Sequence, residues 1–338
     1  MFSFRDLELG LASAPMAGGA TTVALARAVA EAGGFPFLAA GYKSPEALGA
    51  EVAAMRASGH PYGVNLFVPD RRPVDEQTFH AYAARLGAEA DSVNAELDER
   101  IVHDDDAWAA KVALLLTDPV PVVSLTFGLP AADEIAALQA VGTSVLATVT
   151  SVGEALAAAD AGVDGLVFQG VRAGGHSATF DPTRPLPDQE TEVGLRQVLA
   201  AVPLPVIAGG GISGPDDVRR LLAAGADTVA VGTLLLRATE SGASATHQNA
   251  LVDPRYTATT ITRAFTGRPA RGLSNGFIER HEPHAPLGYP EIHHLTRGIR
   301  QAAARAGDAE RLHLWAGTGY RNAEARPVAE ILGNLASR

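Results

Sequence analysis

Hydrophobic and polar positions are grouped in blocks along this chain. Short runs of apolar and β-branched residues recur, each followed by a polar or Gly-rich turn and then by a segment with helical spacing of Ala and Leu. Continuous apolar strands that alternate with helices indicate a parallel sheet buried on both faces. The predicted strands are residues 9–14, 36–40, 62–67, 120–126, 144–149, 164–168, 204–209 and 227–232.

The segments between these strands carry helix-end signals. SPEALGAEVAAMRASG and GPDDVRRLLAAGA place a proline in the first turn, and several segments end in Ala-Gly, which suits a left-handed residue after the helix. Eight strand–helix units are the number in a closed (β/α)₈ or TIM barrel. A doubly wound open sheet is the alternative, but the first turn, APMAGGATT, lacks the GxGxxG spacing. The sequence therefore predicts an α/β fold, a TIM barrel.

The alternation of strands and helices stops after the eighth strand. Residues 237–311 contain helical pieces, the stretch HEPHAPLGYP and no clear strand, which predicts a small helical domain inserted over the barrel mouth. Its aromatic residues Phe265, Phe277 and Tyr289 are expected to be exposed and to shape a substrate pocket. The predicted division is a barrel over 1–236, the covering domain over 237–311, and a C-terminal helix returning to the barrel within 312–338.

Composition excludes several classes of chemistry. The chain of 338 residues is 47% hydrophobic and 19% charged, as in a globular protein with a sizeable core. Cysteine is absent, so disulfides, thiolate nucleophiles and iron–sulfur ligation are all excluded. A formal net charge of −11 without a basic block argues against a nucleic-acid partner. No signal peptide and no uninterrupted apolar span is apparent, so a cytoplasmic protein without a membrane partner is expected.

The ends of the predicted strands carry the candidate chemistry, because TIM-barrel sites lie on the loops that follow the strands. Two of these loops are rich in glycine. Gly209-Gly210-Gly211 follows the seventh strand and Val231-Gly232-Thr233 ends the eighth. Backbone N–H groups in these two loops frequently hold a phosphate, and glycine lets the backbone approach the anion. The alternative is that GGG merely forms a tight turn, but its pairing with VGT favours a phosphate site.

Two carboxamides stand at strand ends where an apolar residue packs better. Asn65 and Gln169 each offer donors and an acceptor, which suits a heterocycle with alternating N–H and C=O edges. Either alone is equally compatible with a structural amide. Together with a phosphate site they indicate a phosphorylated heterocyclic cofactor such as FMN.

His176 is the candidate catalytic residue among ten histidines. It follows Gly174-Gly175 on the loop after the sixth strand, beside the predicted phosphate loops. Histidine suits proton abstraction near neutral pH. A second group, formed by His281, His284, His293 and His294, lacks tight ligand spacing on one helix, so no metal site is predicted.

The motifs APMAGG, GVNLF, FQGVRAGGH, PVIAGGGI, AVGT, ITRAFTGRPARG and LWAGTG follow one another from Ala14 to Gly319. In this combination the chain resembles the nitronate monooxygenases, formerly called 2-nitropropane dioxygenases. GYKSPEALGAE resembles the family's second loop. FMN-dependent enoyl-acyl-carrier-protein reductases and NADH:quinone reductases share much of this pattern.

The resemblance implies an FMN-dependent oxidoreductase that oxidises a small-molecule nitronate with O₂ to a carbonyl compound and nitrite. It implies that His176 is the catalytic base or binds the nitro oxygens. A monomer or a homodimer is expected. Some relatives carry a basic residue near the flavin on the fifth strand, where this chain has Ala147-Thr148-Val149-Thr150. The residues expected to contact FMN are Ala14, Pro15, Met16, Asn65, Gln169, Gly174, Gly175, Gly210, Gly211, Val231, Gly232 and Thr233.

Two other functions stay open from the sequence. The first is an NAD(P)H-dependent FMN reductase of enoyl thioesters or quinones, which needs a nicotinamide site, for example around Arg263, Arg268 and Arg271. The second is a phosphate-binding barrel without flavin, such as a sugar-phosphate isomerase or a non-catalytic scaffold.

Overall fold

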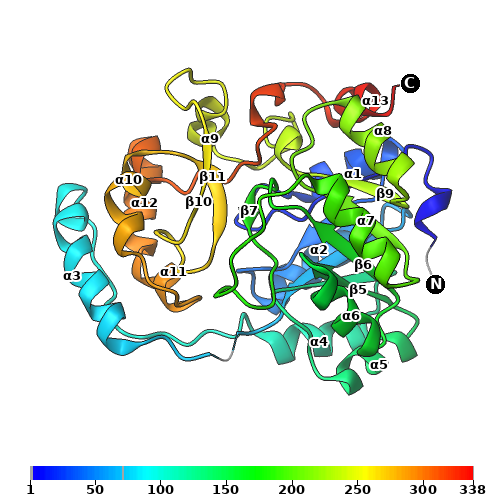
Figure 1. The fold of residues 1–338 in the computed structure, drawn as a ribbon, viewed down its shortest axis with the longest axis horizontal. Helices are drawn as coiled ribbons and strands as arrows, with labels where there is room; N and C mark the ends of the chain where they lie inside the picture. The colour runs from blue at the N-terminus through cyan, green and yellow to red at the C-terminus, as the bar shows by residue number, and fades with distance from the viewer. Residues whose placement is uncertain (1–2, 71, 338) are drawn as a thin grey trace.

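The chain folds into a TIM barrel with a second body beside its mouth (Figure 1). The structure, a computed structural model, describes residues 3–70 and 72–337. The parallel barrel strands are β1 (Leu11–Ser13), β2 (Phe37–Ala39), β3 (Gly63–Phe67), β4 (Val122–Thr126), β5 (Ser144–Val149), β6 (Gly165–Gln169), β8 (Val206–Gly209) and β9 (Thr228–Val231). Each lies within a range predicted from the sequence or one residue beyond it.

The sheet closes on itself. Its order is β1-β9-β8-β6-β5-β4-β3-β2, and Ala12 of β1 forms a parallel bridge with Phe35, two residues before β2. The two ends of the sheet therefore meet, as a barrel requires and an open doubly wound sheet does not.

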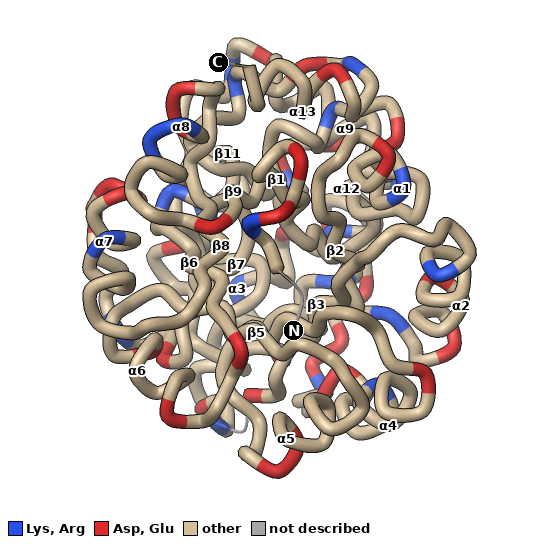
Figure 2. Tube along the Cα trace, turned by 90° about the vertical axis from the view of Figure 1, so that its right-hand side faces the viewer, with Lys and Arg blue, Asp and Glu red and all other residues tan. Residues whose placement is uncertain are grey.

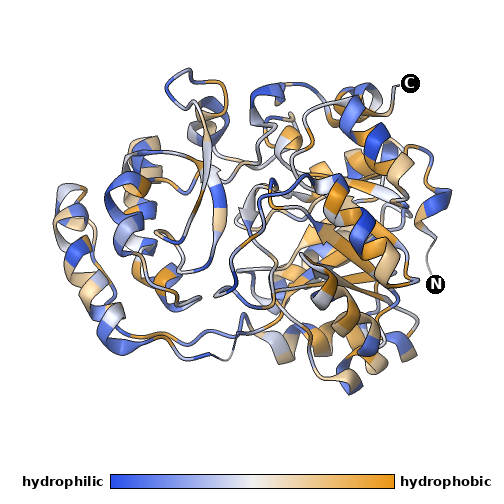
Figure 3. Ribbon diagram, in the orientation of Figure 1, coloured by the Kyte–Doolittle hydropathy of each residue, from blue (hydrophilic) through white to orange (hydrophobic). Residues whose placement is uncertain are grey.

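A ring of helices covers the outside of the barrel (Figure 2). Their charged residues lie mostly on the outside of the molecule, whereas the barrel strands are strongly hydrophobic (Figures 2 and 3). The last helix of the chain packs between α1 and α8. The helices are α1 (Val23–Glu31), α2 (Pro45–Arg56), α4 (Trp108–Thr117), α5 (Ala132–Ala140), α6 (Val152–Asp160), α7 (Thr191–Ala201), α8 (Pro215–Ala224) and α13 (Val328–Ala336).

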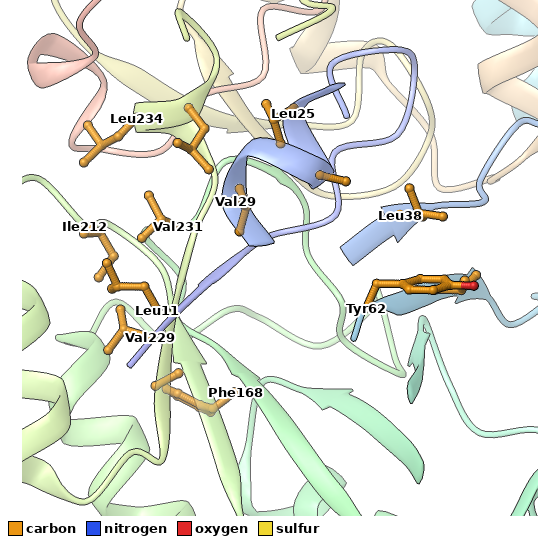
Figure 4. Packing of buried hydrophobic residues seen from close by; sticks show 14 of the residues in the cluster. Leu11, Leu25, Val29, Leu38, Tyr62, Phe168, Ile212, Val229, Val231 and Leu234 are labelled. Carbon is orange, nitrogen blue, oxygen red and sulfur yellow. The ribbon is translucent and has the colours of Figure 1, made fainter. Parts of the chain in front are cut away.

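The main core lies between the sheet and these helices. Leu11, Phe168 and Val229 are buried there and come from three different strands (Figure 4). A smaller cluster closes the bottom of the barrel, where Phe4 of the short 3₁₀ helix η1 (Phe4–Asp6) packs edge-on against Phe35. Both faces of every strand are thus covered, which explains the continuous apolar runs in the sequence.

The body beside the mouth contains strands that the sequence did not indicate. The prediction that residues 237–311 contain no strand is wrong, because β10 (Thr259–Thr262) and β11 (Ala270–Leu273) form an antiparallel pair. The two-residue strand β7 (Gly175–His176) joins β11. The other elements are α9 (Ala245–Ala250), α10 (Gly276–His281), α11 (Glu291–Leu295), α12 (Arg297–Ala306) and the 3₁₀ turns η2 (Thr233–Leu235), η3 (Glu282–His284), η4 (Ala309–Arg311) and η5 (Tyr320–Asn322).

A second hydrophobic core belongs to this body. Phe265 and Phe277 are fully buried and stacked with ring centroids 4.5 Å apart, so the expectation that they are exposed is wrong. They pack against α3 (Glu76–Ser92), which lies between β3 and β4 in the chain. The second body therefore combines two insertions, whereas the division predicted from the sequence left residues 76–92 with the barrel.

Candidate functional site

A cavity of about 810 Å³ lies at the carboxyl ends of the barrel strands. All thirteen residues singled out in the sequence line it, although they come from loops spread over most of the chain. They are Ala14, Pro15, Met16, Asn65, Gln169, Gly174, Gly175, His176, Gly210, Gly211, Val231, Gly232 and Thr233. Their contact with a cofactor remains a prediction.

The loops after β8 and β9 form a cradle of backbone. Gly210 and Gly211 have φ angles of 122° and 76°, which favour glycine. A Cβ on Gly211 would lie 2.7 Å from the Cβ of Arg172, and one on Gly232 would lie 3.3 Å from the Cβ of Ala14. Among the hydrogen bonds of the described residues, none uses the N–H groups of Gly211, Gly232 or Thr233. This arrangement suits an anion such as a phosphate.

The two carboxamides are held differently. Asn65 donates from Nδ2 to the Ser124 oxygens and to Thr126 Oγ1 at distances of 2.9–3.2 Å, and every bond given for its side chain uses that nitrogen. Gln169 donates to the backbone oxygen of His176 at 3.0 Å and accepts from the N–H of Ala178 at 2.8 Å. Gln169 therefore already acts as a structural amide that fixes the loop carrying the histidine.

His176 is placed by a strand pairing. It pairs with Ala270 of β11, so the covering body and the barrel together fix its backbone. A Cβ on Gly174 would lie 2.5 Å from the backbone nitrogen of Gly317, whereas Gly175, at φ 77°, meets nothing within 4 Å. The first glycine thus allows close backbone packing, and the second allows a left-handed turn beside open space.

The imidazole of His176 lies among aromatic rings. Phe127, Tyr289 and Trp315 have centroids 5.5–5.8 Å from it. Its Nε2 lies 2.9 Å from Thr266 Oγ1. Burial lowers the pKa of His176 to about 3, and the charges of Arg268 and Arg300 add to the effect. The imidazole is therefore neutral at neutral pH.

Arg268 supports the wall behind this histidine. Its guanidinium carbon lies 4.0 Å from the ring centre of Phe127, and Phe127 has a φ of 83°, rare for a bulky residue. The Arg268 side chain is fully buried and donates to the backbone oxygens of Ser177 and Thr179. A strained aromatic residue at the cavity wall is thus held between a cation and the imidazole.

The covering body supplies cavity residues that the sequence did not reveal. They come from α11, α12 and the segment after η4. Trp315 belongs to the LWAGTG motif and His293 to the histidine group in which no metal site is predicted; the others, which no motif indicated, are Arg297, Arg300, Gln301, Ala304 and His313. In a helix such as α12 a polar stripe usually faces solvent, so the sequence alone did not indicate that Arg300 is buried in this wall.

The chain matches the family model described as nitronate monooxygenase over residues 11–337. It is 34% identical over 335 residues to a protein named "Probable nitronate monooxygenase" from Staphylococcus aureus strain Newman, covering 98% of this chain and 94% of that protein. The chain belongs to the nitronate monooxygenase family.

Solved structures agree with this assignment to the nitronate monooxygenase family. A nitroalkane oxidase from Streptomyces ansochromogenes is 44% identical, with a TM-score of 0.91 and coverage of 98% of this chain and 96% of that one. FabK from Thermotoga maritima has a TM-score of 0.75 at 24% identity, covers 99% of this chain and 95% of its own, and shows the shared fold. The chain is accordingly an oxidoreductase of this family.

The wall of the cavity near the fifth strand is uncharged in this member of the nitronate monooxygenase family. Thr148, at the position where some relatives are expected to carry a basic residue, is buried, lines the cavity and lies 3.3 Å from Thr126 Oγ1, so this part of the wall is uncharged. Among the described residues no group of three or more His, Asp or Glu side chains is arranged to hold a metal ion. No helix in the described part of the chain is long and apolar enough to cross a bilayer.

The arginines that a nicotinamide site would need are engaged elsewhere. Arg271 donates from Nε to the backbone oxygen of Val171 at 3.0 Å, and Arg263 lies 3.7 Å from Glu282. Arg268 is fully buried, as described above.

Proposed function

We propose that this protein is an FMN-dependent nitronate monooxygenase that oxidises alkyl nitronates with O₂ to carbonyl compounds and nitrite. The observation that carries the proposal is the position of the neutral His176 in the same cavity as the glycine cradle of Gly210, Gly211 and Gly232. Membership of the nitronate monooxygenase family supports the reaction class.

The cradle fits the phosphate of FMN. Side chains at Gly211 and Gly232 would collide with Arg172 and Ala14 and displace the backbone of the cradle, and the N–H groups of the cradle are not used by the described protein groups. Asn65 lies in the middle of β3, on the side of the cavity formed by β3 and β4, where it would meet the heterocycle. When bound, FMN supplies the electron transfer between nitronate and dioxygen.

The protein groups orient the substrate and handle its proton. Thr266 Oγ1 lies 3.3 Å from the backbone oxygen of Arg268, to which it donates. Because the Thr266 hydroxyl donates its hydrogen bond to the backbone oxygen of Arg268, it accepts a hydrogen bond from Nε2–H of His176. The other ring nitrogen, Nδ1, then carries the lone pair that takes a proton from a neutral nitroalkane. The rings of Phe127, Tyr289 and Trp315 pack around the imidazole and limit its rotation.

The test is a direct assay of purified protein. Oxygen consumption and nitrite release are measured against a panel of pre-formed alkyl nitronates and the corresponding nitroalkanes, with oxidation of NADH and NADPH followed in parallel. Nitrite release at the expense of oxygen supports the proposal. Rapid anaerobic bleaching of a bound flavin by NADH or NADPH would instead identify a reductase, and a colourless protein would exclude flavin chemistry.

A further inference from the structure

One face of α12 forms the wall of the cavity that belongs to the covering body. Arg297, Arg300, Gln301 and Ala304 all line the cavity. They follow the i, i+3, i+4, i+7 spacing of a single helix face. This face is polar and basic; Arg297, Gln301 and Ala304 are exposed at the mouth of the cavity, whereas Arg300 is buried. The stripe therefore gives the cavity a second functional wall, separate from the strand ends.

Arg300 is the fixed element of this wall. It is only 8% exposed. Its Nε donates to Thr296 Oγ1 at 3.1 Å and its Nη2 donates to the backbone oxygen of His293 at 2.6 Å. No hydrogen bond to a described residue is given for Nη1. The guanidinium is thus held rigidly by one edge while another nitrogen is left for a ligand.

The charge of Arg300 has no counter-ion among the described residues. No carboxylate there lies within 4.0 Å of it, and the acidic residue of the cavity wall, Asp104, pairs with His294 at 3.1 Å. Its other titratable neighbours do not compensate the charge. Burial lowers the pKa of His293 and of His313 and raises that of Tyr42 to about 12, so all three are neutral near pH 7.

A buried cation without a partner is costly, because its lost hydration is not replaced. Burial lowers the pKa of Arg300 to about 10, so it remains charged at neutral pH. The nearby Arg297 adds positive charge to the same wall. Arg268, the other arginine acting on His176, is different, because Asp70 lies 3.5 Å from it. The missing counter-ion of Arg300 is therefore expected in the ligand.

We propose that Arg300 is a specificity-determining residue that binds a planar oxyanion with two equivalent oxygens, the shared chemistry of nitronate, nitrite and carboxylate. A guanidinium matches such groups better than an ammonium does, because its N–H donors are planar and fixed. The assignment of nitronate and nitrite as sources rests on the proposed function, whereas the anion site itself does not. Arg300 consequently selects the anionic form of a substrate over its neutral form.

Binding without turnover is the primary test. Titration calorimetry on the FMN-loaded protein at pH 7.5 measures the dissociation constants of sodium nitrite, sodium acetate and the neutral acetamide. Acetate and nitrite are expected to bind, and acetamide at least about tenfold more weakly than acetate, because the bond to a charged group is lost. Arg300→Met is expected to raise the dissociation constants of both anions by at least about tenfold.

The matched control is Arg305→Met, which removes the same charge from an exposed position of the same helix. It is expected to leave all three dissociation constants unchanged. Arg300→Lys keeps the charge without the planar guanidinium. Its dissociation constants for the anions are expected to lie between those of the wild type and of Arg300→Met. Thermal unfolding and FMN content are recorded for each variant.

Several outcomes would contradict the assignment of Arg300 as an anion-binding residue. Equal anion binding by wild type and Arg300→Met would do so, as would loss of FMN from that variant, which would make Arg300 a cofactor ligand. If Arg300→Met does not fold, the wild-type comparison of acetate with acetamide and the Arg300→Lys variant still decide. In steady state, Arg300→Met should raise KM for pre-formed ethyl nitronate but not for nitroethane. A wild-type protein that oxidises no nitronate would refute the proposed function while leaving the acetate test intact.

Discussion

The side chain of Gln169 donates a hydrogen bond to the backbone oxygen of His176 at 3.0 Å. Its oxygen accepts from the N–H of the buried Ala178 at 2.8 Å. One carboxamide at the end of β6 therefore binds the chain on both sides of Ser177 and fixes the direction in which His176 leaves β7. The position of the imidazole depends on this residue as well as on the pairing with β11.

Replacing Gln169 with leucine should therefore disturb both stability and turnover. Gln169→Leu leaves the N–H of Ala178 buried without a partner, which costs about 1–3 kcal/mol of the free energy of unfolding. Urea unfolding measures this loss, and kcat should fall because His176 is less well oriented. The control is Gln139→Leu, which removes one surface hydrogen bond to Gly162. Equal stability of the two variants would contradict the cost of the lost hydrogen bond, and an unchanged kcat in Gln169→Leu would contradict a positioning role for Gln169.

The glycine cradle predicts loss of cofactor from a single bulky substitution. Purified wild-type protein should carry about one FMN per chain, since one cradle is present. In Gly211→Val, a β-branched residue must adopt a φ of 76° with its Cβ 2.7 Å from Arg172 and 3.0 Å from Thr318 Oγ1. FMN should be lost while the circular dichroism of the barrel is retained.

Flavin content after denaturation, with mass spectrometry of the released ligand, checks this prediction. Gly214→Ala is the matched control, because Gly214 has extended backbone and nothing within 4 Å of its Cβ position. Release of FAD, pyridoxal phosphate or no ligand from the wild type would rule out the FMN assignment. Full FMN retention by Gly211→Val would move the phosphate site away from this loop.

The sequence carried enough information for the barrel but not for the second body. PVVSLT and SVLATV become β4 and β5 because a strand buried on both faces must be apolar throughout, and that signal is local. TTIT becomes β10 only because it pairs with β11, which holds Arg271 and Gly272 and pairs in turn with Gly175 and His176. The pairing of β11 with β7 joins segments about 95 residues apart, and no local pattern indicates it.

The sequence predicted the part of the candidate site that the barrel strands supply, but not the part that the covering body supplies. The strand-end residues share a rule, because the carboxyl ends of parallel strands meet at one place, and this rule brought Asn65, Gln169 and the glycines together. Arg300 and His313 follow no such rule. They face the cavity because α3, inserted between β3 and β4, packs behind Phe265 and Phe277 and sets the position of the covering body.

The two aromatic residues of that body should respond differently to truncation. Phe277→Ala removes a fully buried ring and should cost about 3–5 kcal/mol of stability. Tyr289→Ala removes a ring that lies 5.5 Å from His176 and 5.4 Å from Phe127. It should change KM and substrate preference while FMN content stays constant. Loss of FMN from Tyr289→Ala would show that this body also holds the cofactor.

Buried histidines predict a protein that loses stability in mild acid. Burial lowers the pKa of His176 to about 3 and that of His247 to about 4, and it also lowers the pKa values of His293 and His313. The unfolded chain then binds more protons below about pH 6.5, the ordinary value for histidine, so the free energy of unfolding falls as the pH falls from about 6.5 toward 4. Each histidine contributes up to about 1.4 kcal/mol per pH unit.

Urea unfolding between pH 5 and 7.5 gives this slope. His313→Phe removes one such group from a site packed against Phe265 and Trp315 and should reduce the slope by about one proton. The comparison variant is His60→Phe at an exposed position. An unchanged slope in His313→Phe would mean that His313 is protonated in the folded protein.

The role of His176 is decided by comparing two forms of one substrate. Burial and the cations Arg268 and Arg300 lower the pKa of His176, which keeps the imidazole neutral but makes it a weak base. Proton transfer to His176 therefore depends on the same two cations favouring the nitronate that forms. Removal of a general base costs about 10²–10⁴-fold. His176→Asn should therefore lose turnover of neutral nitroalkanes by that factor, whereas pre-formed nitronates need no deprotonation and should be affected far less, with FMN still bound. Stopped assays of nitrite release on nitroethane and ethyl nitronate make the comparison. Equal loss on both forms would assign His176 to binding, and no loss on either would leave it a purely structural histidine.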